Sequence, residues 1–143
     1  MSARSKIVDA LIVKLKTIAG TDIYSANLYG NVIKDNKFWD EIVDFPYVCA
    51  IAGTETREYL PGAFKWGFLN ITLRIYVKGE TPIEQLESVM ADIEKCIDAN
   101  RLLVYDLNKS TTEININSIT TDEGLLAPFG VGEIILAVQY QVI

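Results

Sequence analysis

Three carboxylates in the C-terminal part of the sequence are the residues best placed to do chemistry. Asp122 and Glu123 precede a loop rich in glycine and leucine, and Glu133 follows it, so the fold can bring them together. Two carboxylates can serve as a general acid and base, or bind a hard cation. A cation site needs more oxygen ligands at defined spacing, and the sequence offers no such pattern. We therefore favour solvated loop charges and predict no metal site.

The sequence contains no histidine, so any catalysis would have to rest on carboxylates, lysine or tyrosine. Without an imidazole there is no conventional Ser-His or Cys-His nucleophile pair and no imidazole metal ligand. The two cysteines, Cys49 and Cys96, lie in apolar stretches, which is typical of buried, reduced thiols. Two isolated cysteines also cannot supply a four-thiolate zinc site. The sequence predicts no catalytic residue and no cofactor.

The glycines at Gly130 and Gly132 do not form a nucleotide-binding motif. They lead into a strand, whereas a phosphate cradle uses the N–H groups of a helix N-terminus. We interpret them as a turn with a wide bend.

A stretch from Glu55 to Trp66 mixes aromatic and charged residues at the tip of a predicted hairpin. Interfaces use such aromatics as anchors and such charges as rims. We expect Trp66 to fold back onto the sheet as core, and this also remains the alternative for the other aromatics. The residues assigned to a contact between subunits are Glu55, Arg57, Tyr59, Leu60 and Phe64.

The elements that position these residues follow from hydrophobic periodicity. One helix is predicted over residues 5–19. A second is predicted to begin after an N-cap at Thr81 and to end near Asn100. The solvated face of this second helix is expected to carry Glu84, Glu87, Asp92 and Glu94. Strands are predicted over residues 47–59, 68–78, 112–117 and 132–143, and a slip in alternation at Ile119 indicates a bulge or a strand end. Residues 22–46 are expected to cover the far side of the sheet, with a short helix near residues 37–43, or to leave that side to a neighbouring subunit.

This order of elements predicts an α+β fold: a four-stranded, mainly antiparallel sheet with two helices packed on one face and an extended β-hairpin. The 143 residues suit a single domain over residues 1–143. The sequence lacks an apolar run long enough to span a bilayer and the start lacks a signal-peptide pattern, so we expect a cytosolic protein without membrane contact.

The net charge of −6 is concentrated in residues 79–143, which carry eleven acidic and three basic side chains. A protein that grips nucleic acid carries a basic stripe, so this distribution argues against DNA binding. It is compatible with an acidic surface that repels DNA.

The strand at residues 66–78, the helix at residues 80–100 and the loop at residues 121–133 before the last strand together resemble bacteriophage tail terminator (tail completion) proteins. The resemblance runs from about Tyr47 to Ile143. It implies a structural virion protein, assembled in the host cytoplasm, that forms a hexameric ring on the head-proximal end of the tail tube and stops tube polymerisation. The implied partners are other copies of the chain, the tail tube protein and a head-side connector, while DNA passes through the ring without specific binding.

Under this resemblance, Asp122, Glu123 and Glu133 are hypothetical lumen or tube-facing residues, because carboxylates repel phosphate across a narrow channel. The hairpin tip would reach a neighbouring subunit. Two alternatives stay open: another neck component, such as a head-completion or connector protein, and a small-ligand-binding domain of ferredoxin-like layout. The second predicts a concave pocket with converging polar groups.

Overall fold

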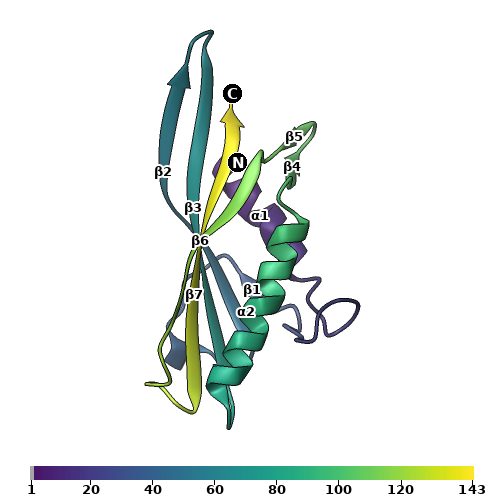
Figure 1. Cartoon of the computed structure of the whole chain (residues 1–143), viewed down its shortest axis with the longest axis vertical. Coiled ribbons are helices and arrows are strands. Elements are labelled where there is room, and N and C mark those ends of the chain that lie inside the picture. Colours follow the sequence, from purple (N-terminus) through teal and green to yellow (C-terminus); the bar gives the residue numbers. More distant parts are fainter. Residues whose placement is uncertain (1) are drawn as a thin grey trace.

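A computed structural model describes residues 2–143 and contains two α-helices and a five-stranded sheet (Figure 1). The elements in chain order are α1 (Ala3–Leu15), β1 (Val32–Ile33), the 3-10 helix η1 (Trp39–Glu41), β2 (Tyr47–Leu60), β3 (Phe64–Lys78), α2 (Pro82–Ala99), β4 (Val104–Asp106), β5 (Lys109–Ser110), β6 (Glu113–Thr121) and β7 (Phe129–Val142). The α+β class is as predicted. No helix within residues 2–143 is long and apolar enough to cross a membrane.

The sheet has the order β1-β2-β3-β7-β6, and its strands are antiparallel except for the β1–β2 pair. The predicted count of four strands is therefore wrong, because β1 adds a fifth. This strand pairs only Val32 and Ile33 with β2, and two residues are too short to leave an alternating pattern in the sequence. The sequence pattern also does not predict the separate β4–β5 hairpin, whose strands have only three and two residues.

Both helices contribute to one hydrophobic core on the same side of the sheet. Burying many aliphatic side chains in this way is the main stabilising contribution to such a fold. The two helices packed on one face are thus as predicted. The core combines buried side chains of α1 and α2 with the inward rows of β3 and β7, among them Ile7, Leu11, Leu86, Ile93, Ile71, Leu73, Leu136 and Val138.

Helix α2 begins at Pro82, where the sequence predicts it, but two details differ. The Thr81 side chain makes no capping hydrogen bond. Asp92, predicted to be solvated, is only 1% exposed, and its carboxylate accepts a hydrogen bond of 2.6 Å from the Ala26 N–H. The prediction failed because the partner is a loop 66 residues away in sequence, which helical periodicity cannot reveal.

The glycines of β7 correct another prediction, since Gly130 and Gly132 lie within the strand and not in a turn. They pair with Val77 and Ile75 on β3. A Cβ atom on Gly132 would lie 2.9 Å from the side chains of Leu86 and Met90, so the missing side chain lets α2 approach the sheet closely. Of the two alternatives indicated by the slip at Ile119, a bulge or a strand end, the structure has a bulge, as a shift in register between Ile116 and Ser118, and β6 continues to Thr121.

The opposite side of the sheet is partly covered by the chain itself, as expected for residues 22–46. Ile42 packs with Cys49 and Tyr76 in a second small cluster, and the Tyr76 hydroxyl donates to the Lys37 carbonyl. The short helix expected near residues 37–43 is η1. Both cysteines are buried and unpaired, as predicted, and burial raises the pKa of each thiol.

Candidate functional site

The tip of the β2–β3 hairpin, residues 60–64, extends beyond the end of β7, which pairs with β3 as far as Lys65 (Figure 1). We call the outer part of this hairpin, residues 54–68, the arm. The turn at its tip places Gly62 at a φ of 82° and Ala63 at 61°, in the left-handed region. A bulge at the base of the arm sets two residues, Gly53 and Thr54, against Asn70 alone. The arm is longer than predicted, because β3 starts at Phe64 and not at residue 68.

The two faces of the arm differ in chemistry. Residues opposite each other on paired strands share a face. The pairs Leu60–Phe64, Glu58–Trp66 and Thr56–Phe68 therefore form one face, which we call the aromatic face. The pairs Tyr59–Lys65, Arg57–Gly67 and Glu55–Leu69 form the other, which continues into the core side of the sheet.

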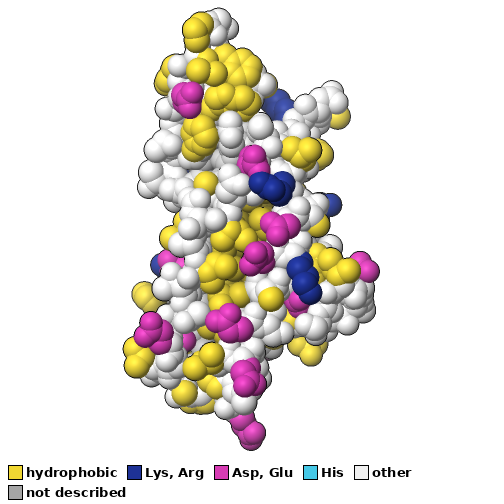
Figure 2. Space-filling view, in the orientation of Figure 1, with side chains coloured by type: hydrophobic (Ala, Val, Ile, Leu, Met, Phe, Trp, Pro, Cys, Tyr) yellow, Lys and Arg dark blue, Asp and Glu magenta, His cyan; other side chains and the backbone are white. Residues whose placement is uncertain are grey.

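On the aromatic face, Phe64 and Trp66 pack edge to face with ring centroids 5.2 Å apart. Trp66 lies opposite Gln141 of β7 and belongs to neither hydrophobic cluster of the described chain. The prediction that Trp66 folds back into the core is therefore wrong. The alternation in the strand assigned it correctly to the row of Phe68, and that row faces away from the helices. Figure 2 shows hydrophobic side chains gathered over this hairpin.

On the other face, Glu55 joins the arm to the C-terminal strand. Its side chain is 3% exposed, accepts a hydrogen bond of 2.8 Å from the Tyr140 hydroxyl and pairs with Arg57. Burial and the Glu55 hydrogen bond raise the pKa of Tyr140 to about 12. The Tyr140 ring lies over Gly67, where a Cβ atom would stand 2.8 Å from it. Sequence reasoning missed Tyr140, which the alternation of β7 marks only as a core residue.

The five residues predicted at an intersubunit contact thus do not form one patch. Arg57 and Tyr59 are exposed on the core-side face of the arm, and Glu55 is buried there against its own chain. Leu60 and Phe64 lie on the aromatic face.

The three predicted lumen carboxylates are only partly brought together. Asp122 accepts hydrogen bonds from the N–H groups of Leu126 (3.1 Å) and Val131 (3.3 Å), so it orders its own loop. Glu133 forms an ion pair of 3.2 Å with Arg74. Asp122 and Glu133 line a shared cavity of about 270 Å³, whereas Glu123 is not part of its lining. No group of three or more acidic or cysteine ligands within residues 2–143 is arranged to hold a metal ion.

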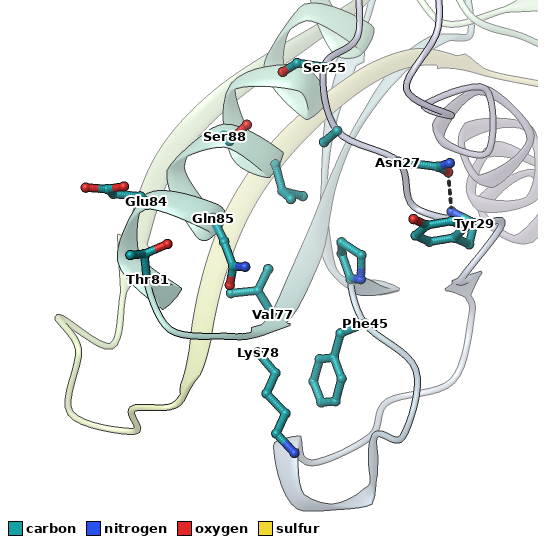
Figure 3. Close-up of a pocket in the computed structure, with 13 residues that line it drawn as sticks. Ser25, Asn27, Tyr29, Phe45, Val77, Lys78, Thr81, Glu84, Gln85 and Ser88 are labelled. Carbon is teal, nitrogen blue, oxygen red and sulfur yellow. Dashed lines mark hydrogen bonds between the residues drawn. The ribbon is translucent and has the colours of Figure 1, made fainter.

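A groove of about 570 Å³ lies between α2 and the segment that precedes β2 (Figure 3). Gln85 of α2 and Val77 of β3 point toward each other, while Phe45 comes from the segment before β2. The Asn27 side chain accepts a hydrogen bond of 2.8 Å from the Tyr29 N–H. The walls of the groove mix apolar side chains such as Val77 with polar ones such as Gln85 and Ser88.

The buried carboxylate of Asp92 fixes one wall of this groove. Besides the Ala26 N–H, it lies 3.4 Å from the Ser25 hydroxyl, a donor, and 3.8 Å from the Lys95 ammonium. Since a buried carboxylate needs partners, the contact holds the loop around Ser25 against α2.

Two comparisons with known proteins point to one family, and a third shows a similar fold. The family model described as Bacteriophage Tail Tube Terminator Protein matches residues 1–143. The tail tube terminator protein p142 of Escherichia phage T5 is 41% identical over 153 residues, covering 99% of this chain and 95% of that protein. A chain in the virion of a native gene transfer agent particle has a similar fold, with a TM-score of 0.64 at 12% identity, over 99% of this chain and 100% of that one.

Proposed function

The chain belongs to the bacteriophage tail tube terminator proteins, and from this membership we propose that it forms a ring of six copies on the head-proximal end of the tail tube. The family is structural, so the chain is a tail component of the virion and not an enzyme, as predicted. In the proposed ring, one face binds the last layer of tail tube protein and ends its polymerisation. The opposite face offers the surface for joining to a head-side connector.

The main support for the proposed ring is that both edge strands of the sheet leave backbone groups without a partner strand. On its outer side, β2 is paired with β1 only at Val48 and Cys49, and β6 has no outer partner within residues 2–143. Residues 114–121 of β6 contain no charge and no proline. Monomeric proteins usually protect such an edge with charges, proline or a covering element.

The two edges suit each other in a closed ring. Successive strands β2, β3, β7 and β6 alternate in direction, so β6 of one copy runs antiparallel to β2 of a neighbour in the same orientation. A contact between two different surfaces of identical subunits is head-to-tail and closes when the rotation permits. Backbone hydrogen bonds across the edges would then join the subunits.

The acidic C-terminal part supports passage of DNA without specific binding. Residues 79–143 carry eleven acidic side chains against three basic ones. Of the three proposed lumen or tube-facing residues, Glu123 is exposed, while Asp122 and Glu133 are engaged with their own chain. We retain all three as proposals, with Glu123 the one best placed to face solvent in a channel.

The test is the mass of the purified protein by light scattering, with and without purified tail tubes, and electron microscopy of tube ends. We expect a species near six times 16.0 kDa, or rings only on tube ends. Asn117→Lys would place a charge on the β6 edge and reduce ring formation, whereas Ala91→Lys, on an exposed position of α2, would not. A monomer that leaves tube ends bare contradicts the proposal. Binding to heads and not to headless tails would favour a connector.

A further inference from the structure

We propose that the β4–β5 hairpin of one copy packs on the aromatic face of the arm of the next copy. This inference rests on the proposed ring and names a specific contact within it. The hairpin carries three exposed aliphatic side chains in or beside two very short strands. Leu102 is 71% exposed, Val104 68% and Leu107 84%. Exposed apolar side chains clustered on one element mark interaction sites.

The surface that would receive this hairpin carries three half-buried aromatic side chains beside Thr56 and Glu58. Phe64, Trp66 and Phe68 project from alternate positions of β3 to the same side. Interface centres are enriched in such aromatics and depleted in charge, and aromatic anchors contribute much of the binding energy. The segment at residues 33–45 covers the other end of this side of the sheet, through Ile42 and Trp39, and leaves the arm end to a partner.

The placement of the two surfaces suits a second copy as the occupant. In Figure 1 the arm lies on one flank of the molecule, and β4 and β5 lie on the opposite flank near the same end of the long axis. Rotation about an axis roughly parallel to that long axis would therefore bring the hairpin of one subunit to the arm of the next at a similar height. A head-to-tail contact requires two such different surfaces.

Charge is complementary at the rim of the two surfaces. Glu58 lies opposite Trp66 on the arm and is exposed, and Lys109 is exposed on β5. Neither forms an ion pair within residues 2–143. Opposite charges beside an apolar contact steer association and fix its register.

Cysteine cross-linking in mixtures tests this contact. Glu58→Cys and Lys109→Cys proteins are prepared separately, mixed under the conditions in which rings form, and oxidised. We expect a disulfide-linked dimer in the mixture and none in either protein alone, because the contact joins different surfaces. Cys49 and Cys96 are buried and should not interfere. No dimer in the mixture, while rings form, overturns the proposal.

A matched control uses Leu125, which is 85% exposed and so resembles Leu107, but lies in the loop before β7. A mixture of Glu58→Cys and Leu125→Cys should give no dimer. Leu107→Asp should weaken ring formation at least roughly tenfold, as expected for loss of an apolar contact in an interface centre, and Leu125→Asp should not. Equal effects of the two aspartates contradict the contact. Rings that cross-link but leave tubes uncapped would instead refute only the proposed function.

Discussion

The hydroxyl of Tyr140 on β7 reaches across β3 and donates a hydrogen bond of 2.8 Å to the buried carboxylate of Glu55 on β2. The two residues are 85 positions apart in sequence. The ring can cross β3 because Gly67 has no side chain at the crossing point. This side-chain hydrogen bond therefore links the base of the arm to the C-terminal strand, in addition to the backbone hydrogen bonds of the sheet.

Tyr140→Phe removes the hydroxyl and leaves the Glu55 carboxylate without that donor. Because Glu55 is buried, we expect a loss of roughly 1–3 kcal/mol in the free energy of unfolding, measured with urea. Tyr105→Phe is the control, since Tyr105 packs edge to face on Tyr140 at 6.1 Å and no hydrogen bond of its hydroxyl is present within residues 2–143. Equal losses in the two variants would argue against a special role for the Tyr140–Glu55 bond.

Gly67→Ala would place a methyl group 2.8 Å from the Tyr140 ring. The ring must shift, so we expect destabilisation of roughly 1–3 kcal/mol in chemical denaturation. Gly53→Ala is the matched substitution, because its Cβ atom would meet only the Asn70 carbonyl at 3.6 Å. In a Tyr140→Ala background the Gly67→Ala cost should fall, as expected for coupled neighbours, and the part due to Val142 Cγ2 at 3.0 Å should remain. An undiminished cost there would mean that the clash lies elsewhere.

Alkaline pH should loosen the same contact. The pKa of Tyr140 is raised from 10.0 to about 12, so the folded state favours the neutral phenol. The stability from this shift is fully present below pH 10 and is lost as the pH rises from 10 through 12. Urea denaturation along this pH range should show a steeper fall for the native protein than for Tyr140→Phe. Parallel curves would contradict the shift.

Asp92→Ala should release the loop around Ser25 from α2. The substitution leaves the Ala26 N–H without its 2.6 Å acceptor, so we expect a loss of roughly 1–3 kcal/mol and faster proteolysis near residue 25. Asp98→Ala, at an exposed position of the same helix, is the control and should change the free energy of unfolding by less than about 0.5 kcal/mol. If the loop of the Asp92→Ala protein resists proteolysis as well as the loop of the native protein does, this role for Asp92 is contradicted.

The parts of the fold that sequence predicts well are long and periodic. The alternation of β3 from residue 69 to 77 and the stripe of α2 from Leu86 to Ile97 identify both elements and their buried faces. Such elements carry enough repeats for the period to be recognised. The α+β class follows from their order.

The parts that could not be predicted depend on contacts between distant segments. Strand β1 exists because two residues meet β2, and Asp92 is buried because a loop folds over it. Gly130 and Gly132 look like turn residues in sequence, but they serve the packing of α2 against β7. The composition of the arm indicated an interface segment, yet the bulge at its base puts Ala52 and Glu55 on the same face of the sheet, and alternation alone does not locate it.

That bulge gives β2 one residue more than its ladder with β3 requires. Ala52 lies opposite Ile71 and Glu55 opposite Leu69. The chain therefore advances three residues along β2 where it advances two along β3. Deleting Gly53 would leave a regular ladder in which Glu55 still faces Tyr140, because every pair beyond the bulge keeps its partner. What would change is direction, since a bulge bends its strand and increases the local twist. The extra residue thus sets the direction of the arm without altering its surface chemistry, and its loss would turn the same aromatic face in a different direction.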